Sequence, residues 1–172
     1  AVATMIIANN GKVYLPHLVK QIQNSQTGEI ENIPAKLLNT LNLKPQHLDI
    51  VKSALVDVTR PGGTAAKASI NAAYTFAGKT GTSQVIGIKQ GERYNEKSIN
   101  ERHRDHAMFI AYAPAEDPKI ALAVLVENTG TGGSTAAPIA RQVFDYFLLG
   151  KPTESTIAQI TESAEEHIHD HL

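Results

Sequence analysis

Five consecutive residues carry the strongest chemical signal in the chain: Gly78-Lys79-Thr80-Gly81-Thr82, an ammonium and two hydroxyls between glycines. A phosphate-binding loop requires Gly, four residues and then Gly-Lys-Ser/Thr, but Ala73 stands where the first glycine is needed. The residues that follow have the composition of a strand, so the helix N-terminus that binds phosphate is missing. The pattern disfavours a nucleotide site, and by itself fits a glycine-interrupted strand with a surface lysine.

Other nucleophiles and metal ligands are scarce. The absence of cysteine excludes thiol nucleophiles, disulfides and cysteine-based zinc sites. Thr64 has Lys67 three residues later, the spacing of an S-x-x-K nucleophile with the wrong hydroxyl. His167, His169 and His171 alternate in a polar tail that cannot preorganise a metal shell, so we expect adventitious binding and no metal site. We expect His106 to be a structural histidine.

Composition limits the class of protein. The chain has 172 residues, 42% of them hydrophobic, with 16 basic and 17 acidic side chains. This length and hydrophobic fraction predict one globular domain, or most of one, and the balanced charge predicts no nucleic-acid partner. The apolar stretches Met5–Ala8 and Ile120–Val126 are far shorter than the ~20 residues that cross a bilayer. Because the sequence opens at Ala1 inside a helix-like stretch, we expect a preceding segment.

The elements that position these residues follow from periodicity. Asn9-Asn10-Gly11 predicts a turn, and the strand-like residues 13–22 with a return after Thr27-Gly28 predict a hairpin. From Pro45 helical spacing continues to Pro61-Gly62-Gly63. The buried face expected of this helix is Leu48, Val51, Leu55 and Val58.

The second half predicts a short helix over residues 64–71 and three strands within 74–88, 106–113 and 119–127. The last two form an antiparallel hairpin across the turn 114–118. The loop 130–133 leads to a final helix that ends at Gly150. Its expected buried face is Ala140, Val143, Phe144, Phe147 and Leu148.

These elements predict an α+β fold, an antiparallel sheet packed with helices. Residues 1–150 form the domain, and residues 151–172 form an acidic polar tail with one lysine against five acidic residues. We expect residues 87–105 to be a solvated connection between strands, or alternatively a loop that faces a substrate or partner.

Four segments, one of which contains the lysine motif, follow one another along the chain. They are P-G-G-T-A at 61–65, A-G-K-T-G-T-S-Q-V at 77–85, R-D-H at 104–106 with A-P at 113–114, and V-E-N-T-G at 126–130. Together they resemble the C-terminal part of the transpeptidase domain in class B penicillin-binding proteins of the elongation type, the penicillin-binding protein 2 family. The resemblance covers about residues 1–150 and implies the fold of penicillin-binding proteins and serine β-lactamases.

The resemblance implies roles for four residues. Lys79, Thr80 and Gly81 match the catalytic K-T-G motif, in which the cation holds the catalytic network and attracts the substrate carboxylate. The hydroxyls of Thr80 and Thr82 would bind the carboxylate of a stem peptide or β-lactam, and the N–H of Thr82 would form half of the oxyanion hole. Gly81 would let a peptide-like substrate lie along the strand.

The family's serine is absent. None of the eight serines has lysine three residues later, and Ser69-Ile70-Asn71 and Ser98-Ile99-Asn100 fall outside the family order of the S-x-N motif. The chain should therefore not acylate by itself, and the missing N-terminal part of the same protein would supply the nucleophile. The resemblance implies a peptidoglycan D,D-transpeptidase that binds β-lactams covalently and needs no cofactor. It also implies an inner-membrane anchor, a periplasmic catalytic domain, and a glycosyltransferase partner of the elongation machinery.

Two other classes stay open. A serine β-lactamase or antibiotic-sensor domain shares K-T-G, and a non-catalytic binding module could keep the fold without the serine.

Overall fold

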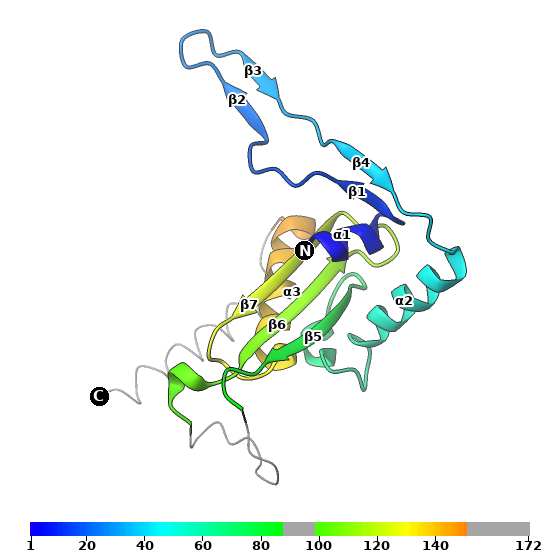
Figure 1. The fold of residues 1–172 in the computed structure, drawn as a ribbon, viewed down its shortest axis with the longest axis vertical. Helices are drawn as coiled ribbons and strands as arrows, with labels where there is room; N and C mark the ends of the chain where they lie inside the picture. The colour runs from blue at the N-terminus through cyan, green and yellow to red at the C-terminus, as the bar shows by residue number, and fades with distance from the viewer. Residues whose placement is uncertain (88–98, 151–172) are drawn as a thin grey trace.

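The computed structural model describes residues 1–87 and 99–150. Figure 1 shows a sheet with helices on both faces, from which a long hairpin projects. The predicted α+β architecture is confirmed. The first half contains α1 (Val2–Ala8), β1 (Lys12–Tyr14), β2 (Gln21–Gln23), β3 (Ile30–Asn32), β4 (Leu37–Thr40), α2 (Pro45–Asp57) and η1 (Ala66–Ser69). The second contains β5 (Ala77–Ser83), η3 (Glu101–His103), β6 (His106–Ala113), β7 (Ile120–Val126), η4 (Gly132–Ala136) and α3 (Ala137–Leu149).

The central sheet has the order β5-β6-β7 and is antiparallel throughout. The predicted hairpin between residues 106–113 and 119–127 is confirmed as β6 and β7, with Ala113 opposite Ile120. The Lys119 N–H donates to the Ala113 carbonyl at 2.8 Å and closes the turn. β5 is shorter than the apolar segment 74–88 because Tyr74 and Phe76 lie in the approach to the strand.

α3, η1 and η4 cover one face of this sheet (Figure 1). The core between them combines small alanines, which allow close approach, with Phe76, Phe109 and Phe144, all fully buried. The rings of Phe76 and Phe144 lie 5.7 Å apart, within the range of favourable aromatic pairs. α3 ends as predicted at Gly150, whose φ of 75° places it in the left-handed region.

The predicted buried face of α3 is partly wrong. Ala140 and Phe144 are buried, but Val143 and Phe147 are 42% and 57% exposed. Arg141 and Asp145 take the inward positions instead. Apolar periodicity missed this orientation because a buried ion pair occupies part of the inner face.

α1 and α2 lie toward the opposite face, where Ala8 packs with Ala77 and Tyr112. α2 begins at Pro45 as predicted, and a short turn of 3₁₀ helix, η1, represents the helix expected over 64–71. The buried face expected of α2 is confirmed only in part: Leu55 and Val58, the residue after the helix, are half-buried against the core clusters, but no residue of α2 is buried and Val51 is 42% exposed. Only the C-terminal part of α2, through Leu55 and Val56, packs against the Tyr112 cluster, because the helix runs out beyond the sheet (Figure 1).

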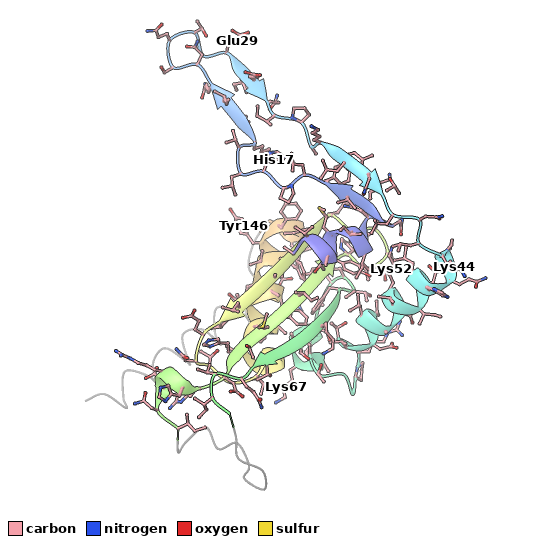
Figure 2. All side chains as sticks on the ribbon, viewed as in Figure 1. His17, Glu29, Lys44, Lys52, Lys67 and Tyr146 are labelled. Carbon is pink, nitrogen blue, oxygen red and sulfur yellow. The ribbon has the colours of Figure 1, made fainter. Side chains whose placement is uncertain are left out.

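Residues 12–40 form a projecting hairpin, here called the arm. The predicted turn at 9–11 and the hairpin are confirmed, but the hairpin is split into two short ladders, β1 with β4 and β2 with β3. Asn10 and Gly11 have φ values of 56° and 89°. Figure 2 shows side chains projecting on both sides of the arm, with Glu29 near its tip and His17 closer to the body. No residue of the arm is buried.

Within residues 1–87 and 99–150, no helix has both the length and the apolar character needed to cross a membrane. Most of the connection predicted over 87–105, and the whole tail with its three histidines, lie outside the described residues.

Candidate functional site

The four predicted site residues lie together on β5, an edge strand of the sheet. Lys79 pairs with Ile110, Thr80 with Phe109, Gly81 with Met108 and Thr82 with Ala107. Among the described strands β5 pairs only with β6, so alternate N–H and C=O groups on its other edge point outward. Such an edge can accept an extended peptide as an added strand.

The motif divides its side chains between the two faces of the sheet, because strand residues alternate. Lys79 and Gly81 share the face of Ala77, toward α1 and α2. Thr80 and Thr82 share the opposite face, where η4 packs against β5. A ligand can meet both the ammonium and the hydroxyls only at the free edge of β5.

The ammonium of Lys79 is exposed and bonds to its own strand. Its Nζ donates to the Thr80 carbonyl at 2.6 Å. No carboxylate in the described part of the chain lies within ion-pair distance of it. The positive charge is therefore available to an anionic ligand.

The hydroxyl of Thr80 has a fixed neighbour, since Thr64 Oγ1 and Thr80 Oγ1 lie 2.8 Å apart. Thr64 follows α2, and the Ala65 N–H donates to the Val58 carbonyl at 2.9 Å, which anchors this connection. Sequence reasoning considered Thr64 only for its spacing from Lys67 and missed this contact. The P-G-G-T-A segment around it was the available signal, but no local pattern pairs two hydroxyls sixteen residues apart.

Glycines allow the backbone to close around β5. A Cβ at Gly78 would lie 2.4 Å from the Phe109 ring. A Cβ at Gly132 would lie 2.1 Å from the Met108 carbonyl oxygen, and one at Gly133 equally close to the Thr64 carbonyl oxygen. The loop predicted to join the last strand to the last helix therefore also packs directly on the K-T-G strand.

His106 and Ser69 have structural contacts. The Nδ1 of His106 accepts a hydrogen bond from the Asn128 N–H at 3.1 Å, in agreement with its structural interpretation. Ser69 Oγ donates to the carbonyls of Thr59 and Ala66, so its hydroxyl stabilises η1. Ser98, the serine of the other S-x-N match, lies outside the described residues.

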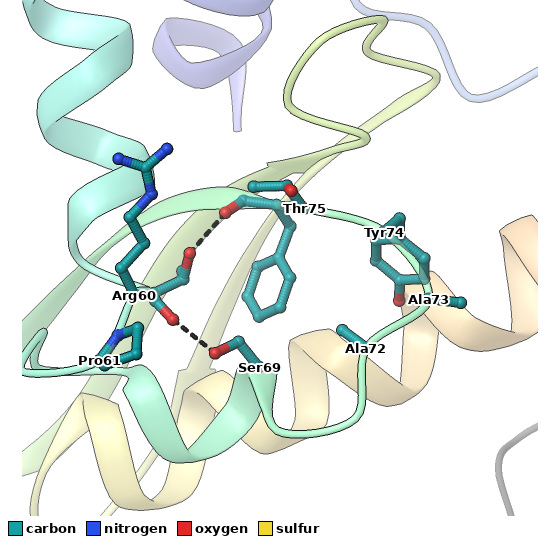
Figure 3. A pocket seen from close by; sticks show the side chains of 9 residues that line it. Arg60, Pro61, Ser69, Ala72, Ala73, Tyr74 and Thr75 are labelled. Atoms are coloured by element: carbon teal, nitrogen blue, oxygen red, sulfur yellow. Dashed lines mark hydrogen bonds between the residues drawn. The ribbon is translucent and has the colours of Figure 1, made fainter.

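A cavity of about 340 Å³ lies between the end of α2 and the approach to β5. Figure 3 shows Ser69 on one side of it and Tyr74 on another. Thr59 Oγ1 donates to the Phe76 carbonyl at 2.7 Å beside this space. It contains none of the four predicted site residues, and residues 1–87 and 99–150 hold no cluster of His, Asp or Glu suited to a metal.

Comparison with known proteins gives a consistent result. Residues 1–145 match the model of the penicillin binding protein transpeptidase domain. Over 149 residues the chain is 41% identical to the peptidoglycan D,D-transpeptidase MrdA of Haemophilus influenzae, covering 86% of this chain and 23% of that protein. The chain thus spans about a quarter of that relative's length.

Two solved structures are similar. The structure of Pseudomonas aeruginosa penicillin-binding protein 2 in complex with WCK 5153 aligns with a TM-score of 0.65 and 35% identity, over 88% of this chain and 30% of that one. The ceftriaxone acyl-enzyme complex of penicillin-binding protein A from Mycobacterium tuberculosis aligns with a TM-score of 0.64 and 30% identity, over 86% and 31%.

Proposed function

The chain belongs to the penicillin-binding protein transpeptidase domain family, and we propose that it is the K-T-G part of a peptidoglycan D,D-transpeptidase of cell elongation. The observation that carries this proposal is the placement of Lys79, Thr80, Gly81 and Thr82 along one open edge strand. Its chemistry is serine-type acyl transfer, since the similar protein from M. tuberculosis has been captured as an acyl-enzyme.

The edge strand would bind the acyl donor. The Lys79 ammonium, with no carboxylate beside it in the described part of the chain, attracts the terminal carboxylate of a stem peptide or a β-lactam. The Thr80 hydroxyl, oriented by Thr64, and the Thr82 hydroxyl donate to the same group. The Thr82 N–H contributes half of the oxyanion hole, and Gly81 keeps the edge open for the substrate backbone.

The nucleophile lies outside these 172 residues, because no serine in them has the S-x-x-K spacing. That serine attacks the carbonyl of the penultimate D-alanine, and the terminal D-alanine leaves as the acyl-enzyme forms. An amine of a neighbouring stem peptide then attacks the ester and regenerates the serine. This chain by itself is inactive, and the N-terminal part of the same protein completes the site.

The cellular setting follows from the family. The complete protein would be anchored in the bacterial inner membrane with its catalytic domain in the periplasm. Its partners would be the stem peptides, β-lactams, and a glycosyltransferase of the elongation machinery. Residues 1–150 would form the C-terminal portion of the transpeptidase domain, followed by the tail.

Labelling of the complete protein with a fluorescent penicillin tests the proposal. Lys79→Ala is expected to abolish labelling, because it removes the cation that binds the carboxylate and holds the catalytic network. Lys119→Ala is the matched control, since Lys119 is also exposed but pairs with Asp117 at 2.6 Å in the β6–β7 turn. Unchanged labelling of Lys79→Ala would contradict the role of Lys79.

A chromogenic cephalosporin distinguishes the reaction class. A transpeptidase holds the acyl group for many minutes and turns over little substrate. Rapid hydrolysis by the complete protein would replace this proposal with a β-lactamase. If the complete protein neither forms a stable acyl-enzyme nor hydrolyses the cephalosporin, a non-catalytic binding module would be favoured.

A further inference from the structure

A polar cluster lies buried on the inner face of α3, the helix that packs against β6, β7 and η1. Arg141 is 7% exposed and Asp145 is fully buried. The Nε of Arg141 donates to Asp145 Oδ1 at 2.7 Å, and the Tyr74 hydroxyl donates to the same oxygen at 2.6 Å. The guanidinium carbon also lies 5.6 Å from the centre of the Tyr74 ring. Two elements distant in sequence are thus joined inside the core.

Arg141 extends this cluster to the backbone of η1 and the turn after it. One terminal nitrogen donates to the carbonyls of Ala68 and Ile70, at 3.1 and 3.3 Å. The other donates to the carbonyl of Asn71 at 3.3 Å. Asn71 has a φ of 56°, a conformation that needs support from its surroundings. One side chain therefore fixes three carbonyls within four residues.

The same backbone segment carries Thr64 at its other end. Ser69 donates to the Thr59 carbonyl, and Thr59 Oγ1 donates to the Phe76 carbonyl at 2.7 Å (Figure 3). Residues 59–76 are therefore tied together around η1 before the chain enters β5. Thr64 belongs to this segment, and its hydroxyl contacts that of Thr80 on β5.

We propose that Arg141 is a positioning residue for the site: it holds residues 59–76 on α3, so that Thr64 orients the Thr80 hydroxyl toward the substrate carboxylate. This inference rests on the proposed function, since the carboxylate is that of the acyl donor. Arg141 itself does not touch the substrate.

The chemistry of the cluster suits arginine alone. A guanidinium presents five N–H donors in a rigid plane, which allows one side chain to bond a carboxylate and several carbonyls at once. The single nitrogen of a lysine cannot reach the same set. Burial and the neighbouring Asp145 raise the pKa of Tyr74, so its hydroxyl keeps its proton and continues to donate.

A double-mutant cycle in the complete protein tests the coupling. Thr64→Val and Arg141→Lys are each expected to lower the rate constant for penicillin acylation about tenfold, the loss that follows when a hydrogen bond to a charged group is disturbed. Because both act through the Thr80 hydroxyl, the double variant should also lose about tenfold. Thr64→Ser, which keeps the hydroxyl, should restore most of the rate. A double variant that loses about a hundredfold overturns the proposal, because independent effects multiply.

Arg60→Lys is the matched control for this cycle. Arg60 belongs to the same segment but pairs with Asp57 on the surface at 3.1 Å. Arg60→Lys should change the acylation rate constant only slightly. In the double variant with Thr64→Val, the two fold-changes should multiply, as they do for independent sites. Tyr74→Phe provides a milder variant should Arg141→Lys fail to fold. This variant keeps the ring beside Arg141 and removes one hydrogen bond, so the acylation rate constant should fall about threefold. In a protein that already carries Thr64→Val, adding Tyr74→Phe should cause no further fall.

Hydrogen exchange separates failure of this inference from failure of the proposed function. Arg141→Lys should speed amide exchange across residues 64–82 and leave β7 unchanged. Exchange that rises only in α3 overturns the positioning role even if penicillin labels the protein. A wild-type protein that penicillin does not label refutes the proposed function, while the exchange pattern still decides whether Arg141 holds Thr64 and β5.

Discussion

The body around α3 and the arm differ in how they are held together. In the body, aromatic rings, alanines and a buried ion pair fill the space between α3 and the strands β6 and β7. In the arm, two ladders of three residue pairs each are held by backbone pairing, and side chains such as Leu18 and Ile22 are exposed. Isolated two-stranded hairpins are marginal in water. The described residues therefore pack most densely in the body, around the sheet that carries the candidate site, and least densely in the arm.

The largest test of this contrast is Phe144→Ala. Removing a fully buried ring that contacts Phe76 should lower the free energy of unfolding by about 4 kcal/mol. Phe147→Ala, on the outer face of the same helix, and Leu18→Ala, in the arm, should each change it by less than about 0.5 kcal/mol. Urea denaturation measures all three. A comparable loss at Phe147 would mean that this side chain is buried against another part of the protein.

Two glycines extend the comparison from side chains to the backbone. Gly132→Ala should destabilise by about 3 kcal/mol, because the new Cβ would lie 2.1 Å from the Met108 carbonyl oxygen and 2.6 Å from that of Gly81. At Gly28, at the tip of the arm, a new Cβ would have no neighbour within 4 Å, so only the positive φ of 73° disfavours alanine there. About 1 kcal/mol is expected there. Equal effects in thermal denaturation would show that η4 can move away from β5.

Tyr74→Phe should have a smaller effect than Phe144→Ala or Gly132→Ala, and its effect depends on pH. At neutral pH the lost hydrogen bond to Asp145 should cost about 1.5 kcal/mol. The folded-state pKa of Tyr74 is raised, so its contribution is fully present below the ordinary value of 10.0 and is lost as pH rises above it. Burial also raises the pKa of Tyr112, but this residue is present in both wild type and variant, so its contribution cancels in the difference. The difference in stability between wild type and variant should therefore shrink above pH 10, and a constant difference in urea denaturation from pH 8 to 11 would contradict this.

Much of the fold was predictable because its signals are local. Two short apolar runs separated by the turn from Pro114 to Pro118 predict β6 and β7, and Pro45 and Gly150 mark helix ends through their own backbone preferences. The K-T-G residues were recognised as one motif since they are consecutive on one strand.

The buried faces were less predictable, for a physical reason. Apolar periodicity assigns Val143 and Phe147 to the core of α3 and Val51 to that of α2, but all three are exposed. Sequence patterns rank side chains by polarity and do not include the partner surface. Arg141 and Asp145 enter the core because each neutralises the other's charge, and only contact across the fold permits that.

The family motifs, the α+β class and the strand that carries Lys79, Thr80, Gly81 and Thr82 are all predicted from residues that are neighbours in the sequence. Three contacts arise from the packing of the folded chain: Thr64 lies beside Thr80, Gly132 lies against β5, and Arg141 bonds to the backbone of the segment that carries Thr64. Local backbone preferences and side-chain polarity are properties of neighbouring residues. A hydrogen bond between residues 16 or 73 positions apart exists only after burial has brought their elements together.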